Sequence, residues 1–222
     1  MTPAARVQAA IELLDQIIDA ATGKGAPADR LIASYFKQRR YAGSKDRRAV
    51  RELVYAAVRA CGAVPENGRA AMLRLAELDE TILPLFDGST HGPAAIGDNE
   101  TPAQGGVAPK WLTVALTASG IDHNEASALL DRAPLDIRVN SLKADRAGIE
   151  LPETGESLSA MQALRFPTGT SVEQWPEYRD GRIEVQDHGS QLVCEAFAAK
   201  PGETVIDLCA GAGGKSLALA AA

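Results

Sequence analysis

The stretch TVIDLCAGAGGKS, residues 204–216, is the most informative part of the sequence. Its first five residues form a short apolar run that predicts a buried parallel strand. The next seven, residues 209–215, form a glycine-rich loop, and residues 216–222 then begin a helix. A strand, a glycine loop and a helix in this order predict the opening of a doubly wound α/β sheet, with the loop close to a ligand.

Three kinds of ligand are compatible with a loop of this type, because its glycines let backbone N–H groups approach a bound molecule. A Walker phosphate loop would need glycine at position 209, where the sequence has Cys209. The dinucleotide pattern GxGxxG fits Gly211 and Gly213, but its third glycine would fall on Ser216. The segment DLCAGAGGK favours the third kind, S-adenosylmethionine. A tight turn without a ligand is the plain structural alternative.

Hydrophobic spacing upstream of the loop predicts a small helical bundle in the first 86 residues. Ser44 is a candidate cap for the third helix, and Asp122 with Glu125 forms the pattern of a capping box further on. Residues 87–108 hold five glycines and two prolines without periodicity, which indicates a linker or a surface excursion. The expected helices cover residues 3–21, 27–39, 45–61, 67–78, 79–86, 109–119 and 122–132.

The part between residues 134 and 183 is expected to be a small α+β unit. Asp136 to Asn140 alternate polar and apolar residues like a strand, and further short strands are expected around 162–166 and 181–185. A helix at 190–199 can be capped by Asp187 or Ser190. Arg138 and Asn140 share one face of the first strand, where ordinary surface polarity would explain them.

Composition excludes several classes of protein. Of 222 residues, 45% are hydrophobic, 5% are aromatic and 40 are alanine, which predicts a mainly helical core with small contacts. No run approaches 18 uncharged apolar residues, so we expect no membrane span. Three separated cysteines, Cys61, Cys194 and Cys209, fit neither a disulfide framework nor a zinc pattern. Together with three scattered histidines, they predict a cytoplasmic protein without a metal site.

Basic residues are concentrated near the N-terminus. Residues 1–60 carry 11 Lys and Arg against 6 Asp and Glu, whereas residues 61–222 carry 12 against 23. The run KQRRYAGSKDRRAVR at 37–51 holds seven positive side chains and one negative. Such a run is often a solvated helix face, but its mixture of Arg, Lys, Tyr, Gly and Ser favours contact with RNA. The candidate RNA contacts are Arg39, Arg40, Lys45, Arg47, Arg48 and Arg51.

Three segments near the C-terminal end carry a family resemblance. EVQDHGSQL at 184–192, KPG at 200–202 and DLCAGAGGK at 207–215 together resemble the Sun/Fmu (RsmB-like) family of RNA cytosine-5 methyltransferases. PLDIRVN at 134–140 and PKWL at 109–112 look like upstream landmarks of that family. YFKQRRYAGSKDRR at 35–48 is similar to the NusB-like domain attached to its bacterial members.

The resemblance implies an order of domains and a set of ligands. It implies a NusB-like helical RNA-binding domain at 1–86, a linker at 87–108, an α+β RNA-binding subdomain at 109–183 and the start of a Rossmann-like methyltransferase domain at 184–222. It raises the expectation that Arg138 and Asn140 face RNA. It further implies that the RNA is ribosomal RNA. It also implies S-adenosylmethionine as cofactor, held along Cys209, Ala210, Gly211, Ala212, Gly213, Gly214 and Lys215.

The sequence departs from the family in two respects. Ala212 stands where the family usually has proline, a change that the loop should tolerate. The family attacks cytosine with a cysteine thiolate and uses a second cysteine for product release, from Thr-Cys and Pro-Cys motifs that do not occur here. We therefore assign no catalytic residue and expect an N-terminal portion of an enzyme, inactive alone. The alternative is a non-catalytic RNA-binding or adaptor protein with a vestigial glycine loop.

Overall fold

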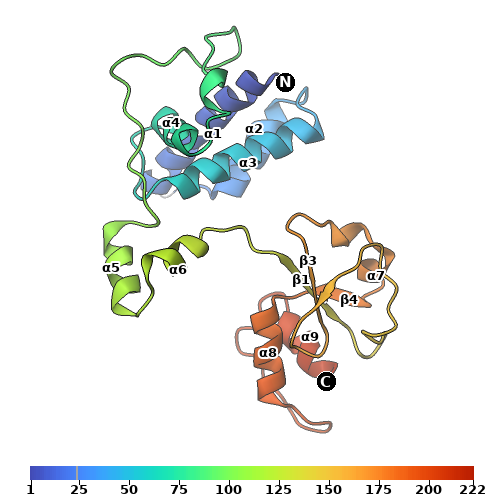
Figure 1. The fold of residues 1–222 in the computed structure, drawn as a ribbon. Coiled ribbons are helices and arrows are strands. Elements are labelled where there is room, and N and C mark those ends of the chain that lie inside the picture. The colour runs from blue at the N-terminus through green and yellow to red at the C-terminus, as the bar shows by residue number, and fades with distance from the viewer. Residues whose placement is uncertain (24) are drawn as a thin grey trace. The chain divides into compact units, whose positions relative to one another are not determined.

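The computed structural model describes residues 1–23 and 25–222, which form two compact units, Met1–Asp131 and Arg132–Ala222 (Figure 1). Packing therefore divides the chain once, between Asp131 and Arg132. The sequence predicted four segments, with boundaries after residues 86, 108 and 183. That four-part organisation stays a prediction. Within the described residues, no helix is both long and apolar enough to cross a bilayer.

The first unit is helical. Its core lies between α1 (Pro3–Gly23), α2 (Ala28–Gln38), α3 (Ser44–Ala60) and α4 (Gly68–Leu78), as the hydrophobic spacing predicted. A 3-10 turn, η1 (Leu83–Leu85), closes the bundle, and α5 (Lys110–Ala118) and α6 (His123–Ala128) follow. The largest fully buried side chains in this core come from all four long helices: Val7, Leu13, Leu14, Ile32, Val50, Val54 and Met72.

The helix starts test the predicted caps. Asp122 and Glu125 form the capping box, with the Glu125 amide donating to Asp122 at 2.9 Å and the Asp122 amide donating to Glu125 at 3.0 Å. The prediction that Ser44 caps α3 is wrong, because Ser44 is already helical and the cap position is Gly43, without a side-chain hydrogen bond. Asn67 instead caps α4 by accepting a bond from the Ala70 amide at 2.8 Å.

The glycine-rich segment 87–108 is attached to the surface of the helical unit. The Gly62 amide donates to the Gln104 carbonyl at 2.9 Å, and the Ala103 amide donates to the Ala70 carbonyl at 2.9 Å. Glu100 forms an ion pair with Arg69 at 2.6 Å. These contacts make the segment a surface excursion that returns to the bundle, one of the two outcomes that its composition suggested.

The second unit is built on a four-stranded antiparallel sheet in the order β2-β3-β1-β4. Its strands are β1 (Leu135–Val139), β2 (Glu156–Ser157), β3 (Ala163–Phe166) and β4 (Ile183–Val185). The sequence predicted all of these except β2. Helical segments η2 (Val172–Gln174), α7 (Pro176–Arg179), α8 (His188–Phe197) and α9 (Gly214–Ala220) complete the unit. The core of the unit contains Ile137, Val139, Leu164, Phe166, Val172, Trp175 and Ile183.

The predicted parallel strand at 204–208 is wrong for this structure. The segment forms no ladder with any described strand, and Ile206 and Leu208 are 84% and 91% exposed. An apolar run becomes a strand only when neighbouring strands satisfy its backbone N–H and C=O groups. The sheet present in the described residues is antiparallel and lies elsewhere, on β1 to β4. The Rossmann-like arrangement therefore stays a prediction, although the loop and the helix after it have formed.

Candidate cofactor-binding site

The glycine loop 209–215 is a tight, exposed turn that leads into α9. Gly211 and Gly213 adopt φ values of 57° and 84°, which side chains other than glycine rarely tolerate. The Gly213 amide donates to the Ala210 carbonyl at 2.8 Å, and Gly213 is the cap residue of α9. A Cβ added at Gly213 or Gly214 would meet nothing within 4 Å, so the backbone is open to an approaching ligand. This is the local geometry that the glycine spacing predicted.

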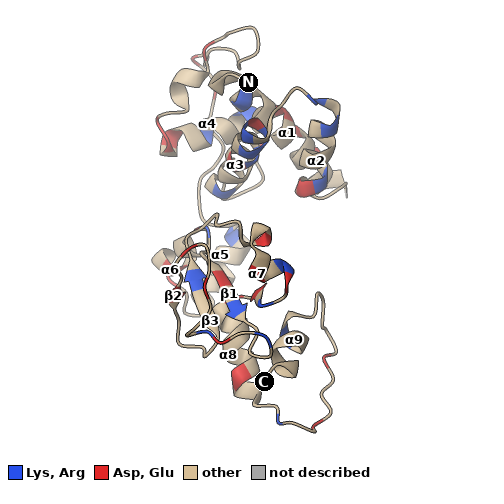
Figure 2. Ribbon diagram, turned by 90° about the vertical axis from the view of Figure 1, so that its right-hand side faces the viewer, with Lys and Arg blue, Asp and Glu red and all other residues tan. Residues whose placement is uncertain are grey.

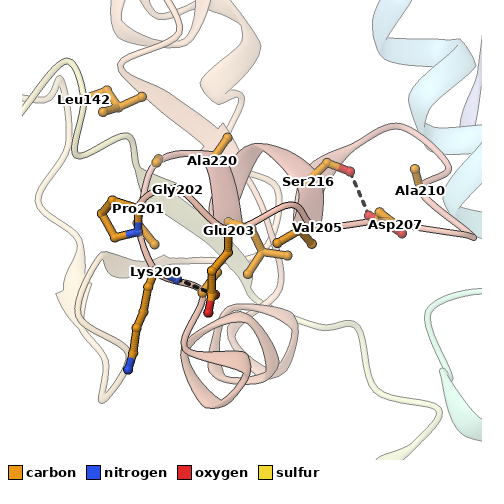
Figure 3. Close-up of a pocket in the computed structure, with 14 residues that line it drawn as sticks. Leu142, Lys200, Pro201, Gly202, Glu203, Val205, Asp207, Ala210, Ser216 and Ala220 are labelled. Carbon is orange, nitrogen blue, oxygen red and sulfur yellow. Dashed lines mark hydrogen bonds between the residues drawn. The ribbon is translucent and has the colours of Figure 1, made fainter.

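A hydrogen bond ties the two ends of the loop together. Ser216 on α9 donates from Oγ to Oδ2 of Asp207 at 2.8 Å (Figure 3). The place of Asp207, directly before the glycine loop, allows two roles: it can order the loop or contact a ligand directly. The Ser216 bond supports the ordering role, since it holds residue 207 beside the first turn of α9.

Two cavities border the loop. The larger, of about 710 Å³, lies between residues 199–210 and α9, and Figure 3 shows Glu203 and Val205 lining it. The smaller, of about 220 Å³, is formed by the loop and the segment that starts α8, including Gln186 and Asp187. Asp207 and Ala210 line both. The smaller cavity is below the usual 300–1,000 Å³ of small-molecule sites, so it fits part of a nucleoside-sized cofactor and the larger one offers room for the rest.

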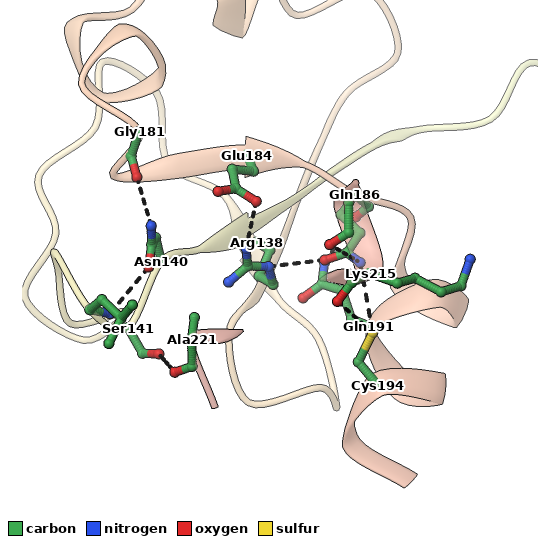
Figure 4. A network of polar contacts seen from close by, with 12 residues as sticks. Arg138, Asn140, Ser141, Gly181, Glu184, Gln186, Gln191, Cys194, Lys215 and Ala221 are labelled. Carbon is green, nitrogen blue, oxygen red and sulfur yellow. Dashed lines mark hydrogen bonds and ion pairs between the residues drawn. The ribbon is translucent and has the colours of Figure 1, made fainter. Parts of the chain in front are cut away.

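Asp187 has the capping role that the sequence suggested. It is the cap residue of α8 and accepts a hydrogen bond from the Ser190 amide at 3.2 Å. Lys215 is exposed at the other side of the small cavity, and Figure 4 shows its side chain extending away from the buried contacts around it. Its ammonium group is therefore free of the core and available to a carboxylate.

The side chains of Arg138 and Asn140 both have hydrogen-bond partners within the second unit. Arg138 is 4% exposed and pairs with Glu184 on β4, while its Nε donates to Gln186 at 3.0 Å (Figure 4). Asn140 donates to the Gly181 carbonyl at 3.0 Å and accepts from the Leu142 amide at 3.2 Å. The strand face that suggested RNA contact is thus covered in this structure, and RNA contact by these two residues stays a prediction.

Asp136 is a site-supporting residue that sequence reasoning missed. Arg165 donates to its two oxygens at 2.7 and 2.8 Å, and the His188 amide donates to Oδ2 at 3.1 Å. The hydrogen bond from Arg165 lowers the pKa of the Asp136 carboxyl, and the bond from the His188 amide contributes in the same direction. Asp136 therefore fixes the start of α8 against β1. Its place on the same strand face as Arg138 was the available signal.

The basic run 37–51 spreads over the end of α2, the turn after it and the start of α3 (Figure 2). Arg39 differs from the others, because it pairs with Glu12 at 3.2 Å and its guanidinium lies 3.6 Å from the centre of the Tyr35 ring. Burial and the hydrogen bond to Glu12 raise the pKa of the Tyr35 hydroxyl. Arg47 is exposed but donates to the Ala42 carbonyl at 2.8 Å. The other candidates are exposed: Arg40, Lys45, Arg48 and Arg51.

Curated relatives of the chain are ribosomal RNA methyltransferases. It is 35% identical over 124 residues, half of its length, to the probable ribosomal RNA small subunit methyltransferase B of Bacillus subtilis. It is 32% identical over 116 residues to ribosomal RNA small subunit methyltransferase B of Pseudomonas putida. The resemblance to the Sun/Fmu family is confirmed. Each match covers about half of the chain and 27% of the relative, so the matched half corresponds to about a quarter of these proteins. No family model matches the chain.

A solved structure resembles the chain in fold. The crystal structure of PH0851 aligns with the whole chain at a TM-score of 0.57 and 20% identity, and the chain covers 61% of that protein. At this identity the match concerns the fold alone. It agrees in coarse outline with the helical part followed by a small α+β part that the sequence predicted.

The three cysteines of the chain have different environments. Cys194 is buried on α8, Cys209 is exposed in the glycine loop, and Cys61 is partly buried just after α3, where burial raises the pKa of its thiol. A raised thiol pKa disfavours the thiolate, which is the nucleophilic form of cysteine. Among the described residues, no cluster of three His, Cys, Asp or Glu side chains could hold a metal ion.

From the sequence, Trp111 and Trp175 are both expected to be packing residues rather than platforms for base stacking. The structure gives them different environments. Trp175 is 8% exposed and packs edge-on against Phe166, with ring centres 5.3 Å apart. Trp111 is 72% exposed on α5, so the packing prediction is wrong for that residue. The short helix α5 buries none of its own side chains, which leaves its apolar face without cover in the described chain.

Proposed function

We propose that the chain is the N-terminal portion of an S-adenosylmethionine-dependent ribosomal RNA cytosine-5 methyltransferase that works in the cytoplasm. In this proposal residues 1–86 form a NusB-like RNA-binding domain and residues 109–183 an α+β RNA-binding subdomain. The segment 87–108, which the sequence predicted as a linker, connects them and contacts the surface of the helical bundle. Residues 184–222 begin a Rossmann-like methyltransferase domain. The names of the curated relatives support ribosomal RNA methylation as the coarse activity.

The glycine loop is the observation that carries the cofactor proposal. The loop from Cys209 to Lys215 contains two positive-φ glycines, Gly211 and Gly213, and borders both cavities. Its residues are exposed except for Gly213 and Gly214, which are half-buried. Exposed backbone N–H groups and the Lys215 ammonium suit the carboxylate end of S-adenosylmethionine, and the adjoining cavity suits its nucleoside. When bound, the cofactor supplies a methyl group on a positively charged sulfur. The residues of this chain would bind and orient it, and none is assigned to the attack on cytosine.

RNA recognition is proposed for the first unit through its exposed basic side chains. Arg40, Lys45, Arg48 and Arg51 are exposed, and a group of positive charges of this kind favours phosphate contacts. Arg39 and Arg47 are included in the proposal, although each also has an intramolecular partner. For Arg138 and Asn140, RNA contact would require release of their present partners, so we rank them below the basic run.

Titration calorimetry with S-adenosylhomocysteine tests the cofactor proposal. The wild-type chain should bind this demethylated form of the cofactor more tightly than ATP or NAD⁺. Gly213→Val places a β-branched residue at a φ of 84° and should weaken the binding at least about tenfold. Gly169→Val is the matched control, because Gly169 has a φ of 91° and equally open surroundings but lies outside the loop. Tighter binding of ATP or NAD⁺, or equal losses in the two variants, would contradict the proposal.

A further inference from the structure

Gln186 connects the antiparallel sheet to the glycine loop through the two ends of its side-chain amide (Figure 4). Its Oε1 accepts a hydrogen bond from Arg138 Nε at 3.0 Å, and its Nε2 donates to the Gly214 carbonyl at 3.2 Å. The side chain is well buried, since Gln186 is 6% exposed. Because a guanidinium only donates and a carbonyl only accepts, these two partners determine which end of the amide faces each of them.

The sheet end of this connection is rigid. Arg138 lies in the middle of β1 and is also paired with Glu184 on β4. The main chain of Gln186 is bound at both of its polar groups: its amide donates to the Asp136 carbonyl at 3.1 Å, and its carbonyl accepts from Gln191 Nε2 at 2.9 Å. Buried groups with this many bonded partners have few alternative positions. Gln186 is therefore a fixed point from which the loop can be held.

At its other end, the connection reaches the glycine loop, which has few other contacts among the residues that the structure describes to hold it in place. The preceding segment 204–208 makes no strand ladder with the described residues, and residues 208–212 are exposed. Gln186 holds the first residue of α9 by its carbonyl, and Cys194 adds a weaker contact from Sγ to the Lys215 carbonyl at 3.9 Å. The small cavity lies where these groups meet, with Gln186, Gly214 and Lys215 in its wall.

We propose that Gln186 is a positioning residue, which holds the glycine loop in the conformation that receives the methyl donor. It does so by linking the Gly214 carbonyl to Arg138 on β1, and it needs no contact with the cofactor. The identity of the ligand rests on the proposed function, whereas the mechanical link does not. A side chain behind the ligand-binding groups can control binding in this way by limiting the conformations of the groups in front of it.

Two substitutions separate the loop contact from the sheet contact. Gln186→Glu keeps an oxygen acceptor for Arg138 but replaces the donor to Gly214 with a second oxygen, which repels the carbonyl. Gln186→Met keeps the volume and loses both bonds without adding charge. Glu184→Gln is the control, because it alters the other partner of Arg138 and leaves the Gln186–Gly214 bond unchanged.

Amide hydrogen exchange of the whole chain measures the effect. The reporters are the Gly213 and Leu217 amides, which donate to Ala210 and Gly213 carbonyls at 2.8 Å each. Loss of one buried hydrogen bond should accelerate their exchange about five- to tenfold in both Gln186 variants and by less than about twofold in Glu184→Gln. The Val139 amide, which donates to the Gln162 carbonyl at 2.9 Å, reports on the sheet and should not change.

Several results would overturn the positioning role. One is unchanged exchange of the loop amides in both Gln186 variants. Another is loop exchange that accelerates as much in Glu184→Gln as in the Gln186 variants. A third is exchange of the Val139 amide that accelerates as much as that of the loop amides, because this would mean that the whole unit is loosened. A parallel titration with S-adenosylhomocysteine separates this inference from the proposed function. If the loop amides exchange faster in the Gln186 variants but the wild type does not bind S-adenosylhomocysteine, the positioning role stands and the proposed cofactor is wrong. If the wild type and both Gln186 variants bind S-adenosylhomocysteine equally tightly and loop exchange is unchanged, the proposed cofactor stands and the positioning role is wrong.

Discussion

Asp136 is a buried carboxylate on β1 whose ionised form is stabilised by Arg165 and by the amide of His188. Hydrogen bonding from Arg165 lowers its pKa in the folded chain. Its contribution to stability is therefore complete above the unfolded pKa of about 4 and is lost as the pH falls through the folded pKa.

Asp136→Asn should reduce the free energy of unfolding at pH 7 by about 1–3 kcal/mol, because a charged hydrogen bond is replaced by a weaker one. Denaturant unfolding from pH 7 to pH 3 measures this loss. The gap between the wild type and the variant should narrow below about pH 4, as the wild-type carboxylate becomes protonated. A gap that stays constant over this range would show that the carboxylate charge contributes nothing.

Helices α1 and α4 approach each other closely at Gly68. A Cβ at this position would lie 2.3 Å from the Ile11 carbonyl oxygen and 2.9 Å from the Asp15 amide nitrogen. The Gly68 amide also donates to the Asp15 carboxylate at 2.6 Å, so α1 supplies a partner for the first turn of α4. The two helices thus form one rigid pair on which the bundle core is built.

Gly68→Ala should therefore lower the stability of the first unit by about 1–3 kcal/mol, because backbone atoms of α1 must move to make room. Thermal unfolding followed by circular dichroism measures the change. The matched control is Gly23→Ala at the end of α1, where a Cβ meets nothing within 4 Å, and where alanine should be neutral or slightly stabilising. Equal midpoints for the two variants would contradict the close helix contact.

The whole molecule is acidic, with a net charge of −6, yet its basic run is exposed on α2 and α3. In the proposed function, this combination would limit RNA contact to the basic run, since negative charge elsewhere on the chain repels phosphate. The proposal can therefore be tested with two sets of substitutions that change the total charge equally.

Changing Arg40, Arg48 and Arg51 to glutamate should weaken binding to a ribosomal RNA fragment. The magnitude of the slope of log K against log salt concentration should fall by about 2, because three phosphate contacts on a single strand are lost. Fluorescence anisotropy across a salt series provides the measurement. Glutamate at Arg30, Arg59 and Lys110, which are also exposed in the first unit, makes the same charge change outside the run. Similar losses in both triple variants would mean that the RNA responds to total charge alone.

The sequence by itself determined the features that depend on near neighbours. The helices of the bundle follow from apolar spacing, the start of α6 from Asp122 and Glu125, and the turn at 209–215 from its glycines. In each case the partners lie within a few residues along the chain, so the pattern contains the necessary information. The glycine loop of the candidate site could be recognised for the same reason.

Tertiary structure alone decided the features that need a distant partner. Residues 204–208 have the composition of a strand but no ladder, because strand formation requires backbone groups that the local sequence does not provide. Arg138 reads as a surface residue until Glu184 and Gln186 cover it from 46 and 48 residues away. The supports of the glycine loop are of this second kind, since burial and pairing across the chain are set by packing and not by local pattern.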